Sequence, residues 1–73
     1  KGNIMDFENY LFEEADKFLI ERNEKHEWKT KEIIVTDVDY SILRYVSDDN
    51  REFYIRVLHG DIFTVMPAGK EAF

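Results

Sequence analysis

Cysteine is absent from this chain of 73 residues, so no disulfide can hold the fold together. The two histidines, His26 and His59, lie far apart in the sequence, which argues against a structural zinc site as well. A domain this short buries only about 60% of the surface of its unfolded chain, and small domains often need a disulfide, a metal or a partner. We therefore expect a dense aromatic core, or association, to supply the missing stability.

Glycine, proline and basic residues are also scarce. The three glycines are isolated, so they cannot form a phosphate-binding loop. Ten basic residues against sixteen acidic ones give a net charge of −6, which argues against direct binding of nucleic acid or of an anionic membrane. A basic or nucleic-acid-binding protein is compatible with this charge as a partner, and plain solubility explains the charge equally well.

Long apolar runs are missing too. No segment approaches the roughly 20 apolar residues that span a bilayer, and the amino terminus has no signal-peptide pattern. Together with the lack of cysteine, this favours a soluble cytoplasmic protein. The hydrophobic fraction of 44% and the aromatic fraction of 15% are nevertheless too high for a disordered acidic tail. The sequence predicts one small folded domain over residues 1–73.

A helical pattern runs from about residue 3 to about residue 25. Asn3 can cap the helix, Asp6 places negative charge in its first turn, and Asn23 is a suitable end. The apolar residues form a stripe about 160° wide, which suits a helix that lies across a sheet. The stripe consists of Ile4, Met5, Phe7, Leu11, Phe12, Ala15, Phe18 and Leu19.

After Lys31 the hydrophobic pattern changes to the alternation of β-strands. Residues 31–47 are too long for one typical strand, and we expect them to bend, bulge or split at residues 36–39. Residues 47–51 have the composition of a turn, and Pro67 ends the last strand. The expected strands are 31–37, 39–47, 52–58 and 61–66. This pattern predicts an α+β fold of two layers, with the helix packed on a three- or four-stranded antiparallel meander.

Trp28 lies in the polar connection between the helix and the first strand, where we expect it to plug the edge of the core. His59 and Gly60 are interpreted as the turn of a hairpin. One register places Phe53 opposite Val65, and a tighter turn shifts this pairing by one residue. Both registers leave His59 at an exposed tip.

No catalytic or metal-binding pattern accompanies the polar residues. His59 and Asp61 have no serine or cysteine motif beside them, and an exposed turn offers no pocket that excludes water. Asp37 and Asp39 would share one side of a strand, but the glycine and glutamate of a calcium loop are missing. His26 is expected to be solvated. We therefore expect no cofactor, no metal and no enzymatic activity.

The exposed side of the helix is where we expect a partner to bind. It is acidic, and apolar residues lie among its charges. These features favour a small non-enzymatic protein-binding module, an inhibitor or regulatory accessory that occupies the surface of a partner protein. In its sharpest form, the hypothesis describes a phage or mobile-element inhibitor that mimics nucleic acid. The expected partner-binding residues, called the helix arc below, are Tyr10, Glu13, Asp16, Lys17, Ile20, Glu21 and Glu24.

An alternative hypothesis is a self-associating structural subunit, such as a homodimer, or a domain of a larger assembly. The interface would then be the face of the sheet that points away from the helix, called the outer face below. This face is unusually apolar for one turned to water. Its expected members are Tyr40, Ile42, Arg44, Val46, Tyr54, Arg56 and Ile62.

Overall fold

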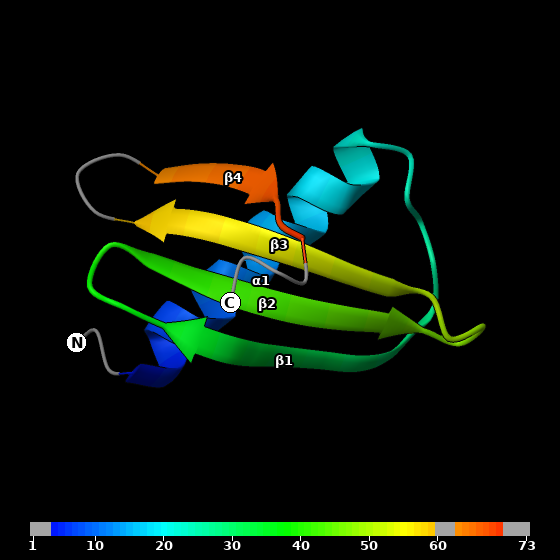
Figure 1. Ribbon diagram of the computed structural model, residues 1–73, viewed down its shortest axis with the longest axis horizontal. Helices are drawn as coiled ribbons and strands as arrows, with labels where there is room; N and C mark the ends of the chain where they lie inside the picture. The colour runs from blue at the N-terminus through cyan, green and yellow to red at the C-terminus, as the bar shows by residue number, and fades with distance from the viewer. Residues whose placement is uncertain (1–3, 60–62, 70–73) are drawn as a thin grey trace.

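The computed structural model of the protein describes residues 4–59 and 63–69. One helix, α1 (Ile4–Glu21), packs against one face of a four-stranded antiparallel sheet (Figure 1). The strands are β1 (Trp28–Thr36), β2 (Tyr40–Ser47), β3 (Glu52–His59) and β4 (Phe63–Pro67), and they lie in the sheet in chain order. The predicted α+β meander is therefore confirmed, with four strands. No helix among the described residues is long and apolar enough to cross a membrane.

The core lies between α1 and the middle of the sheet. Leu11, Ala15 and Leu19 recur every four positions, so they share one side of the helix, and all three are buried. Phe12 and Phe18 pack against the same cluster and are half-buried. From the sheet, the cluster receives Leu43, Tyr45, Ile55 and Val57. The predicted apolar stripe, from Leu11 to Leu19, is thus the face that meets the sheet.

The helix ends at Glu21, earlier than the predicted boundary near residue 25. Asn23 adopts a left-handed conformation with φ 67°. The Asn23 N–H donates to the Ile20 carbonyl at 3.0 Å, and the Glu24 N–H donates to the Leu19 carbonyl at 2.8 Å. These two bonds form a Schellman motif, which satisfies carbonyl groups that the helix leaves free at its end. Asn23 was correctly predicted as the stop.

The long apolar run after the helix forms two strands. β1 begins at Trp28, three residues before the predicted start, and ends at Thr36. The turn that follows is closed by a bond from the Asp37 N–H to the Tyr40 carbonyl at 2.7 Å. Asp37 and Asp39 therefore lie in a hairpin turn and not along one strand, which corrects the sequence interpretation.

The turn between β2 and β3 lies where the sequence predicts it. Asn50 adopts φ 69°, its N–H donates to the Ser47 carbonyl at 2.9 Å, and the Ser47 N–H donates to the Arg51 carbonyl at 3.0 Å. The Ser47 hydroxyl donates to the Asp49 carboxylate, and this hydrogen bond lowers the pKa of Asp49. The side chains of Ser47 and Asp49 thus help to close the turn, and Asn50 closes it through its backbone.

The register between β3 and β4 differs from both sequence predictions. Val57 pairs with Val65, whereas the first predicted register places Phe53 there, so β4 is displaced by four residues along β3. Side chains alternate along a strand, and a shift by an even number keeps the same side chains on the same face. The apolar alternation of both strands matches equally well after such a shift. The pattern therefore identifies the helix-facing residues without fixing the register.

His59 lies within β3 and is half-buried, so its predicted place at an exposed tip is wrong. Its Nε2 atom lies 2.9 Å from the Ser41 hydroxyl oxygen, in hydrogen-bond contact, and its ring meets the Phe7 ring edge-on at 5.0 Å. These contacts with β2 and α1 favour the longer strand. The expectations for Gly60, Asp61 and Ile62 lie outside the described residues.

Candidate functional site

The negative charge of the protein is concentrated on α1. Six of its 18 residues are acidic and one is basic, a net charge of −5, whereas the whole chain carries −6. The rest of the chain is therefore almost neutral. One side of α1 packs on the sheet (Figure 1), and four of the six acids, Asp6, Glu8, Glu13 and Glu21, are exposed to solvent. The helix layer is thus strongly acidic.

Four members of the helix arc lie open on this side. Ile20 is 54% exposed and Tyr10 is 37% exposed, which makes them conspicuous apolar residues on a charged surface. Glu13 and Glu21 are exposed, and neither forms an ion pair with any described residue. The arc therefore offers apolar area together with carboxylates that form no ion pair with a described residue.

Asp16, by contrast, fastens the helix to the sheet. It accepts a hydrogen bond of 2.7 Å from the hydroxyl of Tyr45, and Lys31 Nζ lies 3.2 Å from the same carboxylate oxygen. The Tyr45 side chain is buried, and its hydroxyl also lies 3.2 Å from the Phe12 carbonyl. Burial and the hydrogen bond to Asp16 both raise the pKa of Tyr45. Asp16 was predicted as a partner-binding residue, but its main contacts are internal.

Glu24 and Lys17 also have internal partners. Glu24 contacts His26 Nε2 at 2.8 Å and Arg51 at 3.9 Å. Lys17 pairs with Glu14 at 3.2 Å, and this contact raises the pKa of Lys17. Glu24 was predicted as part of the helix but lies after its end at Glu21, and neither of these partners was visible in the helical period.

His26 packs among aromatic side chains at one end of the sheet. Its ring lies 5.3 Å from Trp28 and 5.3 Å from Phe53, and it is half-buried. The prediction that His26 is solvated is therefore wrong, because the connection after α1 runs close along the ends of the strands (Figure 1). Trp28 meets the rings of Tyr45 and Phe53 edge-on at 5.0 and 5.3 Å, so its predicted place at the core edge is confirmed.

A groove of about 270 Å³ lies beside the helix arc, between the end of α1 and the start of β1. Leu19, Ile20 and Trp28 supply its apolar wall. The other residues that line it are Asp16, Glu24, Lys25, His26 and Lys31. Sequence reasoning missed this groove, because its two sides come from elements whose packing the helical period does not define. We call it the Trp28 groove.

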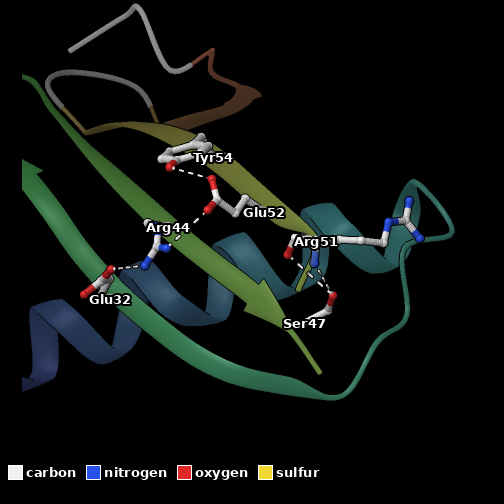
Figure 2. A network of polar contacts seen from close by, with 6 residues as sticks. All are labelled: Glu32, Arg44, Ser47, Arg51, Glu52 and Tyr54. Atoms are coloured by element: carbon white, nitrogen blue, oxygen red, sulfur yellow. Dashed lines mark hydrogen bonds and ion pairs between the residues drawn. The ribbon is translucent and has the colours of Figure 1, made fainter. Parts of the chain in front are cut away.

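The outer face of the sheet carries a row of polar contacts across three strands. Figure 2 shows Arg44 of β2 between Glu32 of β1 and Glu52 of β3, at 2.7 and 3.4 Å. The Tyr54 hydroxyl extends the row by a bond of 3.1 Å to Glu52. The hydrogen bond to Glu32 is the main reason why the pKa of Arg44 is raised. The row crosses the centre of the surface expected to drive self-association.

The apolar residues of the outer face are covered. Ile42 is 0% exposed and Val46 is 7% exposed, although both point away from α1. Arg56 stands opposite Ile42 in the register, and its guanidinium lies 5.3 Å from the centre of the Tyr40 ring. The Arg56 stem must therefore pass beside Ile42. The residues predicted for the outer face lie on it as expected, except Ile62, which is outside the described residues. They expose little apolar area to solvent.

Ser41 and His59 are in hydrogen-bond contact between β2 and β3, and Ser41 is completely buried. Within residues 4–59 and 63–69, no group of three or more histidine, aspartate or glutamate side chains is arranged to hold a metal ion.

Comparison of the chain with known protein families, with curated proteins and with solved structures found no match.

Proposed function

We propose that this chain is a small non-enzymatic protein-binding module that acts by occupying the surface of a basic partner protein. The binding surface is the open part of the helix arc. In this role the protein is an inhibitor or a regulatory accessory, which acts by blocking the surface of the partner that it covers.

The observation that carries this proposal is the distribution of charge. α1 holds a net charge of −5 out of −6 for the whole chain, and Ile20 and Tyr10 are exposed among its acids. Complementary charge raises the rate of encounter and selects the partner, while apolar residues at the centre of an interface supply affinity. The two ingredients occur together on α1.

A nucleic-acid-binding protein with a basic groove is the sharper form of this partner. Its groove is built to receive phosphates, and a helix rich in carboxylates presents charge of the same sign. The complex should then weaken steeply as the salt concentration rises.

The test uses the protein as bait for partners from its native host at low and at high ionic strength. The variant Glu13→Lys/Glu21→Lys reverses the two unpaired acids of the arc. The matched control, Glu27→Lys/Asp39→Lys, makes the same change in net charge at exposed positions outside α1.

We expect the wild type and the control to retain a common basic partner that the arc variant loses. Equal loss of the partner by the two variants would show that net charge, and not the helix arc, governs binding, and full retention by both would show that the arc is not the binding surface. A complex insensitive to salt would contradict the nucleic-acid mimicry.

A further inference from the structure

We propose that the Trp28 groove is the anchor site of this interface, and that it receives one aromatic or large aliphatic side chain from a lysine- or arginine-rich segment of the partner. The inference depends on the proposed function, because it places the centre of the proposed binding surface in the groove beside the helix arc. It adds the chemistry of the partner segment: an apolar residue with positive charge on either side.

The size and wall of the groove suit a single side chain. Its volume of about 270 Å³ lies below the roughly 300–1,000 Å³ of sites for small-molecule ligands, but it is large enough for one aromatic ring. Ile20 and Trp28 form the apolar wall, and Ile20 is more than half exposed at its edge. Pockets that bury one large apolar side chain are typical centres of protein interfaces.

The charged groups at the rim already have partners. Asp16 contacts Lys31 at 3.2 Å, and Glu24 contacts His26 at 2.8 Å. An apolar side chain can therefore enter without leaving a buried charge unpaired, which would otherwise oppose binding. Lys25 also lines the groove and forms no ion pair with a described residue, so a cation inside the groove would be repelled.

The positive charges of the partner belong beside the groove. Glu13 lies two turns before Ile20 on the same side of α1, and Glu21, the residue after Ile20, lies about 100° further around the helix. Both are exposed without an ion pair to a described residue. Basic residues that flank the anchor meet these carboxylates while the apolar side chain fills the groove. Charge complementarity thus selects a basic segment, and the wall of the groove selects the residue at its centre.

Trp28 is the only tryptophan of the chain, so its fluorescence reports directly on the groove. Three short peptides serve as probes: one phenylalanine flanked by lysines, the same peptide with alanine at the centre, and the phenylalanine peptide with serines in place of lysines. We expect the phenylalanine–lysine peptide to bind about tenfold more tightly than the alanine peptide, and to shift the Trp28 emission. The serine peptide should bind more weakly than either lysine peptide.

Two variants complete the test. Ile20→Ser removes an exposed wall residue and should abolish the advantage of phenylalanine over alanine. Val38→Ser, which changes an aliphatic residue that is 84% exposed in the β1–β2 turn, should leave that advantage unchanged.

If both lysine peptides bind equally and the Trp28 emission does not move, the groove is not the anchor, while the helix arc remains the binding surface. If neither lysine peptide binds, the anchor and the proposed function both fail. If the Ile20→Ser variant still binds the phenylalanine peptide more tightly than the alanine peptide, the phenylalanine binds outside the Trp28 groove.

Discussion

At the scale of single residues, Tyr45 is the main polar link between the two layers. Its side chain is buried in the core, yet its hydroxyl reaches Asp16 on α1 at 2.7 Å. Asp16 in turn contacts Lys31 on β1. One carboxylate therefore joins the helix to two strands, and this geometry explains why a residue that looks exposed by helical period has an internal role.

The variant Tyr45→Phe tests this link. It removes the hydroxyl while keeping the ring, and we expect it to lower the free energy of unfolding by about 1–2 kcal/mol at neutral pH. Urea denaturation of the wild type and the variant measures the difference. No loss would show that Lys31 alone satisfies Asp16.

The raised pKa of Tyr45 predicts a dependence on alkaline pH. In the unfolded chain a tyrosine ionises at about pH 10, whereas Tyr45 in the folded protein stays protonated beyond that value. Its contribution to stability is complete below about pH 10 and is lost as the pH rises further. The wild type should therefore lose more stability than Tyr45→Phe above pH 10, and parallel loss in the two proteins would contradict this assignment.

Asp49 predicts the opposite dependence, at acid pH. The hydrogen bond from Ser47 lowers its pKa below the ordinary value of 3.8, so its contribution is present above that value and is lost as the pH falls through the lowered pKa. Asp49→Asn should be less stable than the wild type at pH 7, and the two should converge in acid. Thermal melts across this range provide the measurement, and a constant difference would argue against ionisation of Asp49 as the cause.

The limits of sequence reasoning at this scale are visible in Glu24 and His26. Periodicity separated the buried side of α1 from its exposed side, but it placed Asp16 with the exposed residues and extended the helix to include Glu24. The periodicity contains no information on which residues of other elements pack against the helix. The contact of Glu24 with His26, and the rings of Trp28 and Phe53 around His26, depend on how the connection crosses the ends of the strands.

At the scale of elements, the end of α1 is determined by a single residue. Asn23 adopts the left-handed conformation that closes the Schellman motif, and few residue types other than glycine and asparagine adopt it readily. The sequence identified this stop because asparagine is common at such positions.

Asn23→Ala should cost about 1 kcal/mol, since alanine carries a side-chain carbon that opposes positive φ. Asn23→Gly should retain the stability of the wild type or exceed it slightly. Thermal unfolding of the three proteins is the measurement. Equal effects of alanine and glycine would mean that the Asn23 side chain, and not its backbone conformation, stabilises the helix end.

The hairpin of β3 and β4 shows why strand existence was predictable and strand register was not. Alternating apolar residues revealed both strands and the face that meets α1. The register, in which Val57 pairs with Val65, depends on the inclusion of His59 in β3. That inclusion is stabilised by Ser41 and Phe7, two residues distant in sequence, and no local pattern reports such contacts.

At the scale of the whole molecule, both edges of the sheet discourage pairing with a second chain. β1 has irregular register between Trp28 and Thr30 and again between Ile33 and Val35, and lysines alternate along its first half. β4 is short and ends at Pro67, which has no N–H to donate. Irregular register, charge, short length and proline are all devices that protect edge strands.

We accordingly expect the protein to be a monomer of 8.8 kDa, even at high concentration. The covered state of Ile42 and Val46 on the outer face leads to the same expectation. Light scattering after gel filtration measures the mass directly. A stable dimer would instead favour the alternative of a self-associating subunit.

Because α1 lies on one side of the sheet and carries almost all of the net charge, the molecule is an electric dipole as well as an anion. At low salt the field of a cationic surface extends about 30 Å, which is comparable to the 36 Å length of the molecule. The protein is therefore oriented with α1 toward that surface before the two make contact. On an amine-coated sensor it would settle with α1 downward and hide the surface of interest. Attachment through the β1–β2 turn, which lies at the opposite end of the sheet from the end of α1 (Figure 1), would leave that end of α1 accessible to a partner in solution.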